Sequence, residues 1–135
     1  MTGVLRVTRL PNNPIIRPNM DDRMGSNING PSLIRIPEWI KNPLGKYYLY
    51  FGHHDGKFIR LAYSDDLIGP WHTYRPGTLQ LDDSHFTGHI GSPDVHVDDS
   101  SRQIKMYFHG SDTATGQGGK QSTRLAISAD GLSFL

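Results

Sequence analysis

Short runs of β-branched and aromatic residues, separated by Gly, Pro, Asn and Asp, make up most of the chain after residue 30. Runs of this kind between turn-forming residues predict β-strands. Residues 46–51 (KYYLYF) form an aromatic run, and Asp55-Gly56 follows as a hairpin signal before the next run, residues 58–64. No segment has a convincing helical period. The pattern therefore predicts an all-β protein.

The expected strands fall into two similar units, residues 31–80 and residues 81–135. The first unit has four expected strands, and the second has three followed by a turn that leads toward a fourth. The motif RLAYS at residues 60–64 matches RLAIS at residues 124–128, and matching positions lie roughly 57 to 64 residues apart. Four antiparallel strands in a repeated unit are typical of β-propeller blades.

Two such units cannot close a propeller, which typically has about 4 to 8 blades. We therefore expect the chain to be the N-terminal part of a longer protein, with its second blade truncated. An independent β-sandwich of about seven strands is the alternative. Residues 1–30, rich in Pro and Asn, are expected to form an irregular arm, although the alternation over residues 4–10 predicts a short strand within it.

Composition narrows the classes of function. The formal net charge is +1, from 14 basic and 13 acidic residues, so the basic surface typical of nucleic-acid binding is not expected. No stretch approaches the roughly 20 apolar residues of a membrane span. The absence of Cys excludes disulfides and thiolate chemistry. No secretory signal is visible, which slightly favours a cytoplasmic location while leaving the localisation unknown.

Several segments resemble the five-bladed β-propeller glycoside hydrolases of family forty-three, the arabinanase and β-xylosidase type. The resemblance covers about residues 14–135, and it rests on residues 31–34 (PSLI), 45–51 (GKYYLYF), 59–65 (IRLAYSD), 67–71 (LIGPW), 92–95 (SPDV) and 128–134 (SADGLSF). It implies about two of five propeller blades, a carbohydrate substrate and hydrolysis of glycosidic bonds in oligo- or polysaccharides.

The resemblance also implies three carboxylates around a central channel. In the relatives, an Asp base precedes the Pro of the first blade, a second Asp follows the Pro of the second blade and tunes the acid, and a Glu from a later blade is the general acid. This chain has Gly30 at the first position and Asp94 at the second, and the Glu would lie beyond Leu135. An arm carboxylate, Asp22 or its neighbour Asp21, is then the candidate base, and the chain alone is expected to be inactive.

Glycosidic cleavage needs two carboxyl groups that flank the scissile bond, roughly 6.5–9.5 Å apart when a water attacks directly. A third carboxylate nearby raises the pKa of the acid by like-charge repulsion. Strand alternation places Asp94 and His96 on one face and Val95 on the other. The alternatives are structural: Asp94 as a turn cap beside Pro93, and Asp22 as a solvated loop acid.

Hydrogen-bonding and aromatic side chains supply candidates for sugar binding. These are Asn29, His53, His54, His96 and Trp39, with packing against the blade as the alternative for Trp39. The seven histidines lack a metal-binding spacing such as H-E-x-x-H, so we expect neither a metal site nor a cofactor. The expected partner is a carbohydrate, without nucleic acid or membrane, and the sequence indicates no oligomeric state. A non-catalytic carbohydrate-binding or scaffold propeller is the alternative function, favoured by Gly30.

Overall fold

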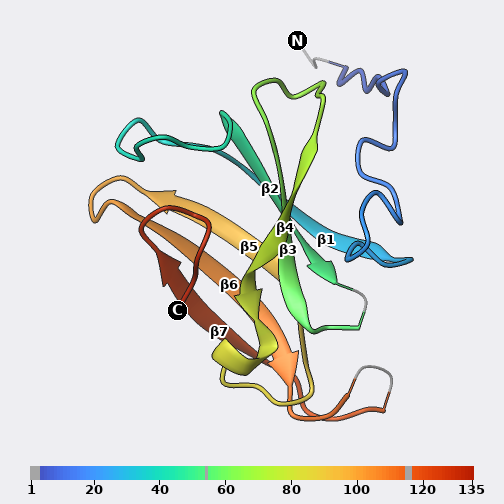
Figure 1. The fold of residues 1–135 in the computed structure, drawn as a ribbon, viewed down its shortest axis with the longest axis vertical. Helices are drawn as coiled ribbons and strands as arrows, with labels where there is room; N and C mark the ends of the chain where they lie inside the picture. The colour runs from blue at the N-terminus through green and yellow to red at the C-terminus, as the bar shows by residue number, and fades with distance from the viewer. Residues whose placement is uncertain (1–3, 54, 115–116) are drawn as a thin grey trace.

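A computed structural model describes residues 4–53, 55–114 and 117–135, and its regular structure consists of two antiparallel β-sheets (Figure 1). The first sheet has the order β1-β2-β3-β4 and the second has the order β5-β6-β7. The strands are β1 (Ile28–Arg35), β2 (Tyr47–His53), β3 (Phe58–Ser64), β4 (His72–Gln80), β5 (His89–Asp98), β6 (Gln103–Ser111) and β7 (Ser122–Ser128). One 3-10 turn, Leu81–Asp83, connects the sheets. The predicted all-β class is confirmed, and the described residues contain no helix long and apolar enough to cross a membrane.

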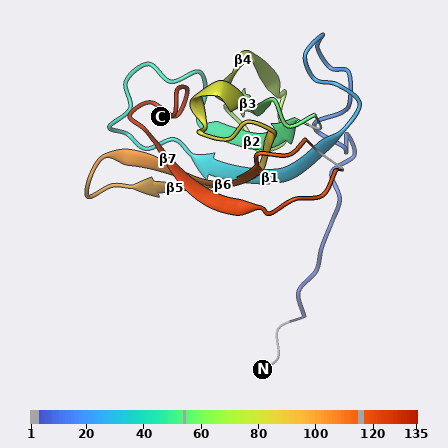
Figure 2. The same ribbon diagram turned by 90° about the horizontal axis from the view of Figure 1, so that it is seen from below.

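The two sheets stack as layers, with β5 lying against β1 and β2 (Figure 2). Among the described residues, seventeen buried side chains form the core between the sheets, including Tyr48, Tyr50, Ile59 and Leu61 of the first sheet and Val95, Ile104, Met106 and Phe108 of the second. The hydroxyl of Tyr50 donates to the carbonyl of Gly131 at 2.9 Å and so links β2 to the turn after β7. Burial of this apolar surface is the main force that holds the sheets together.

The arm covers the far side of the first sheet instead of adding a strand to it. Met24 is buried there in a second cluster with Phe51 and Trp71, and Ile15 and Ile16 pack on that cluster. The strand predicted at residues 4–10 is wrong: this segment has no regular structure, and Val4 is 93% exposed. The alternation of apolar and polar residues does not by itself make residues 4–10 a strand, because a strand also needs a neighbouring strand to hydrogen-bond its backbone.

Two predicted boundaries also differ from the structure. β1 begins at Ile28, so the ordered strand starts inside the predicted arm of residues 1–30. Pro76-Gly77, expected to close the first unit, lies within β4. The ladder with β3 is irregular between Ile59 and Leu61, and Gly77 has a φ of +75°. A bulge of this kind lets a strand pass a Pro-Gly pair and then resume its pairing.

The sheets repeat one another residue by residue. In the first, Ser32 pairs with Tyr50 and Tyr50 with Leu61; in the second, Asp94 pairs with Tyr107 and Tyr107 with Leu125. These registers make Ser32 equivalent to Asp94, Tyr50 to Tyr107 and Leu61 to Leu125. The repeat predicted from the RLA motifs is therefore a structural repeat.

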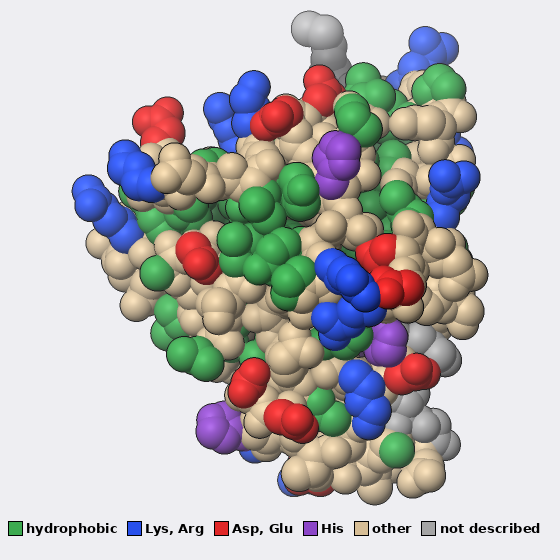
Figure 3. Space-filling view, viewed as in Figure 1, with side chains coloured by type: hydrophobic (Ala, Val, Ile, Leu, Met, Phe, Trp, Pro, Cys, Tyr) green, Lys and Arg blue, Asp and Glu red, His purple; other side chains and the backbone are tan. Residues whose placement is uncertain are grey.

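The turns after the third strands are equivalent too. Ser64 accepts the backbone N–H of Asp66 at 3.1 Å, and Ser128 accepts that of Asp130 at 3.2 Å. Asp130 in turn accepts the backbone N–H of Leu132, and the backbone of Leu135 then pairs with that of Ile127 on β7. Charged side chains of both signs are interspersed over the surface seen in Figure 3, as expected for a net charge of +1.

Candidate functional site

Both sheets carry a β-bulge at the same point of their first strand. The register shifts between Asn29 and Ser32 in β1, and between Gly91 and Asp94 in β5. We call these two segments, residues 29–32 and 91–94, the bulge rim. The residue before proline has a positive φ in each, +56° at Gly30 and +46° at Ser92. Bulges re-aim side chains and occur often beside active sites, so the bulge rim is the candidate site.

Gly30 lets the two halves of the bulge rim approach closely. A Cβ atom at residue 30 would lie 2.8 Å from the Cα of Ser92. Its φ of +56° is also a conformation that L side chains adopt only at a cost. The position where the resemblance expects a carboxylate therefore has room for glycine alone.

Polar side chains fill equivalent places beside the two bulges. Asn29 folds over its partner Gly52, where a Cβ would lie 2.5 Å from the Asn29 Oδ1. In the second sheet the glycine is on the first strand and the polar side chain is on the second. There His109 of β6 pairs with Gly91 of β5, and the His109 Nε2 lies 3.8 Å from the position of a Cβ at Gly91. Asn29 is exposed and His109 half-buried. An amide and an imidazole at such positions can hydrogen-bond hydroxyl groups of a ligand.

A buried arginine holds the start of β1 in place. Arg60 on β3 donates through Nη2 to the carbonyls of Asn27 at 2.7 Å and Gly52 at 2.6 Å. Its guanidinium also lies over the ring of Phe51. Burial lowers the pKa of Arg60 to about 10, while the charge of Asp21 opposes that shift. Arg60 therefore stays charged at neutral pH and fixes the backbone on either side of Asn29.

Asp94 projects outward from β5, as alternation predicts. Asp94 and His96 are exposed and Val95 is buried. The Asp94 Oδ2 lies 2.9 Å from the His96 Nε2, and the His96 ring meets Tyr107 edge-on with centroids 6.0 Å apart. The equivalent Ser32 instead accepts the backbone N–H of Val95 in the neighbouring sheet at 2.9 Å. Ser32 therefore faces the second sheet, whereas Asp94 lies on the exposed face of the second sheet that points away from the first.

Asp22 lies in a different place from Asp94. It pairs with Arg75 of β4 at 2.5 Å and lines a polar hollow of about 740 Å³ that also contains His53, Asp55 and Asp82. Neither Asp94 nor Asn29 lines that hollow. The structure thus brings Asp22 together with His53 but does not join it to Asp94.

The remaining predicted residues have structural contacts. Asp21 accepts the backbone N–H of Arg23 at 2.8 Å. Burial raises its pKa, but hydrogen bonds from Thr73 and from the backbone of Arg23 and Met24 outweigh this and hold the pKa below its usual value. The His53 ring stacks on Phe58 at 4.6 Å. These contacts place both residues in the packing of the arm.

Trp39 is tied down at the far end of β1 and β5 from the bulge rim. Its Nε1 donates to Asp99 Oδ1 at 2.9 Å, and the indole packs on the main core. This favours the packing interpretation over a sugar platform. His54 lies outside the described residues.

Sequence reasoning did not select His89 and His109 as site residues. Their rings meet edge-on with centroids 6.3 Å apart, and the His89 Nδ1 lies 2.9 Å from the carbonyl of Thr113. Burial lowers the pKa of His109, and the nearby His89 lowers it further. The signal that could have found His109 is its register opposite Gly91, which depends on the bulge. Within the described ranges no group of three or more His, Asp or Glu residues could hold a metal ion.

We expect the stability of the protein to decrease as the pH falls below about 6.5, the usual pKa of histidine. The pKa of His109 is lower in the folded protein, so the unfolded chain binds more protons below that pH. The contribution of neutral His109 to the free energy of unfolding is therefore fully present above about pH 6.5. It is lost as the pH falls from there toward the lower pKa that His109 has in the folded protein. Urea unfolding between pH 8 and pH 5 measures it. His109→Gln should flatten this part of the profile, whereas His85→Gln, at an exposed position, should not.

A search against models of known protein families found none that matches the chain. The chain is similar to an uncharacterized protein of Acanthamoeba polyphaga mimivirus, with 38% identity over 128 residues. The match covers 80% of this chain and 36% of the viral protein. The chain thus spans about a third of the length of that relative.

Proposed function

We propose that the two sheets are two blades of a five-bladed β-propeller of the glycoside hydrolase type, and that the complete ring binds and hydrolyses carbohydrate at the bulge rim. The observation that carries this proposal is the matched pair of bulges at Gly30-Pro31 and Ser92-Pro93. Each bulge lies on the first strand of its sheet. Equivalent bulges bring polar side chains of successive units to one place, as a site assembled from several blades requires.

The stacking of the sheets also supports blades over an independent sandwich. The face of the first sheet that holds Tyr50 is buried against the face of the second that holds Met106. The equivalent of Tyr50 in the second sheet, Tyr107, is on the opposite face and 42% exposed. The units therefore stack front to back, in the manner of successive blades.

In the proposed site, Asp94 tunes a general acid that another blade supplies, and Asn29 and His109 hydrogen-bond sugar hydroxyls. Among the described residues no second carboxylate joins Asp94 at the bulge rim, since Asp22 pairs with Arg75 instead. Because glycosidic hydrolysis needs two carboxyl groups, we propose that the 135-residue chain alone binds sugar without cleaving it.

A non-catalytic carbohydrate-binding propeller is the second candidate. The position expected for the base is Gly30, where a Cβ would lie 2.8 Å from the Cα of Ser92. A propeller whose first blade has this close contact at Gly30 can bind sugar hydroxyls at the bulge rim, but it has no room for a carboxylate base at residue 30. The two candidates differ in turnover and share the binding site.

Binding of oligosaccharides tests both candidates. We expect Asn29→Ala to weaken the binding of neutral oligosaccharides to the 135-residue chain by about 2- to 10-fold, the value of one hydrogen bond. Isothermal titration calorimetry against arabino- and xylo-oligosaccharides measures this change. Asn12→Ala, at an exposed position in the arm, is the matched control. If no oligosaccharide binds the chain, the site is not at the bulge rim.

Turnover then separates the candidates. Hydrolysis of aryl glycosides by the complete ring should fall about 100-fold or more in kcat/KM with Asp94→Asn, because the acid loses the charge that tunes it. Binding without turnover by the wild-type ring would instead support the non-catalytic candidate.

A further inference from the structure

The guanidinium of Arg60 is buried, and only one of its three nitrogens has a hydrogen-bond partner among the described residues. Nη2 donates to the carbonyls of Asn27 and Gly52, whereas Nε and Nη1 are buried without an acceptor. Arg60 as a whole is 4% exposed, so these nitrogens are shielded from bulk water. Because charged donors are costly to bury unpaired, the two nitrogens mark a place where a ligand is needed.

A small cavity adjoins Arg60 beneath the arm. Its volume is about 10 Å³, and its lining includes the polar side chains of Asp21 and Thr73 and the apolar side chains of Met24 and Phe51. A cavity of this size has room for one water molecule and is too small for an organic ligand. A buried water also needs about two to four polar partners, and Arg60, Asp21 and Thr73 supply them.

Asp21 places a negative charge beside this cavity. Its carboxylate is half-buried on the arm, where it accepts the backbone N–H of Arg23 at 2.8 Å. Burial lowers the pKa of Arg60 to about 10, and the charge of Asp21 acts against that shift. An inorganic anion in the cavity would meet the charge of Asp21, whereas a water molecule can accept from Arg60 and donate to Asp21. The charges therefore favour water as the occupant.

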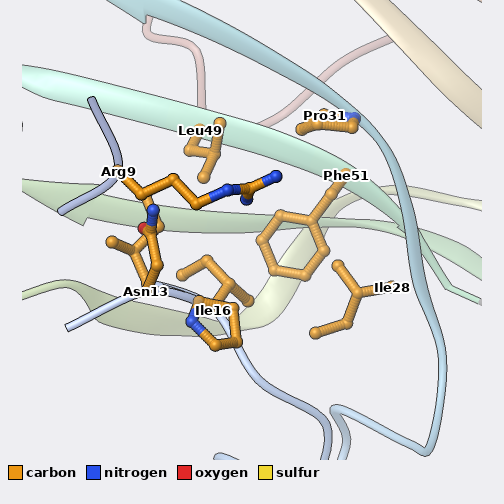
Figure 4. Close-up of a pocket in the computed structure, with 9 residues that line it drawn as sticks. Arg9, Asn13, Ile16, Ile28, Pro31, Leu49 and Phe51 are labelled. Atoms are coloured by element: carbon orange, nitrogen blue, oxygen red, sulfur yellow. The ribbon is translucent and has the colours of Figure 1, made fainter. Parts of the chain in front are cut away.

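Apolar contacts hold the arm over this part of the first sheet. Ile16 of the arm and Ile28 face the ring of Phe51 around an apolar hollow of about 580 Å³ (Figure 4). The same ring lies under the guanidinium of Arg60, whose Cζ is 4.9 Å from the ring centroid, and it also lines the small cavity. Docking of the arm on Phe51 thus brings Asp21 to the cavity that Arg60 lines.

We propose that one water molecule occupies the small cavity and bridges Arg60 to Asp21, so that the docked arm holds the arginine that positions the bulge rim. The water oxygen accepts from Nε and Nη1, and one of its hydrogens donates to the Asp21 carboxylate. Arg60 in turn fixes the carbonyls of Asn27 and Gly52, which lie on either side of Asn29. Arg60 is thus a positioning residue for Asn29. The water site is independent of the proposed carbohydrate chemistry, so either can fail alone.

Nuclear magnetic resonance of the ¹⁵N-labelled 135-residue chain tests the water site directly. We expect an Overhauser effect between water and the Nε–H of Arg60, measured in the rotating frame, where its sign separates it from proton exchange. A resolved Nε–H signal without this effect would mean that the cavity is dry, and would overturn the proposal. A signal that shifts when chloride replaces sulfate at constant ionic strength would identify an anion as the occupant, and would overturn it as well.

Asp21→Asn tests the link between the arm and the bulge rim. Asparagine retains an oxygen that can accept the backbone N–H of Arg23, but it removes the charge beside Arg60. We expect the Nε–H of Arg60 to exchange with solvent roughly tenfold faster and the side-chain amide resonances of Asn29 to shift, because charge-assisted hydrogen bonds are the stronger ones. Asp82→Asn, at an exposed carboxylate of the 3-10 turn, is the matched control and should change neither.

Arg60→Lys separates positioning from the presence of a charge. Lysine retains the positive charge but lacks the planar fork of donors, so the Asn29 resonances should shift further than in Asp21→Asn. Near-ultraviolet circular dichroism verifies that each variant folds. Unchanged Asn29 resonances in a folded Arg60→Lys variant would overturn the positioning role. If that variant does not fold, the two aspartate variants decide: equal Arg60 exchange rates and equal Asn29 resonances in Asp21→Asn and Asp82→Asn would overturn the proposal.

Discussion

Gly30→Ala is expected to lower the free energy of unfolding by about 2–4 kcal/mol. Two costs combine at this residue. A left-handed φ of +56° disfavours any L side chain, and the new Cβ would meet the Cα of Ser92 at 2.8 Å. That Cα is backbone of β5 and cannot rotate away, so the sheets must separate locally. Urea unfolding measures the difference.

Gly118→Ala isolates the first of these costs. Gly118 has a φ of +71°, and no atom lies within 4 Å of the position of its Cβ. We expect a loss of about 1 kcal/mol there, from the backbone conformation alone. If Gly30→Ala lowers the free energy of unfolding by no more than Gly118→Ala does, β1 and β5 do not approach each other as closely as described.

Gly30→Asp extends the argument to function. Aspartate is the residue that the glycoside hydrolase resemblance expects at this position, and it should destabilise the fold at least as much as alanine. Restoring the residue of the relatives therefore should not restore their base. If the proposed propeller cleaves glycosides, its base must come from a residue other than residue 30, or the segment around residue 30 must be placed differently there.

Local patterns were sufficient to predict the strands and their repetition. The RLA motifs at residues 60–62 and 124–126 occupy equivalent positions, because period-two alternation and the Ser-x-Asp turn act over a few residues. Residues 4–10 carry the same alternation and form no strand. The strands of the sheets have a neighbouring backbone to pair with, and residues 4–10 have none among the described residues. A local sequence pattern carries no information about such a neighbour.

The candidate site was predictable only in part. Alternation placed Asp94 beside His96 correctly, since both lie on one strand. The alternation pattern could not predict where the Asp22 side chain lies, because its partner Arg75 is 53 residues away in the sequence. It also could not select His109, because the space above Gly91 exists only once the bulge has shifted the register of β5 against β6. Site residues that depend on pairing between strands need the fold before they can be recognised.

Tyr50→Ala should lower the free energy of unfolding by about 3–5 kcal/mol, whereas Tyr107→Ala should change it by no more than about 0.5 kcal/mol. The two tyrosines occupy equivalent positions in the two sheets. Tyr50 is fully buried, packs edge-on against Phe134 with centroids 5.8 Å apart and donates to the carbonyl of Gly131, whereas Tyr107 is 42% exposed. Tyr50→Phe, which removes the hydroxyl alone, should cost about 1 kcal/mol.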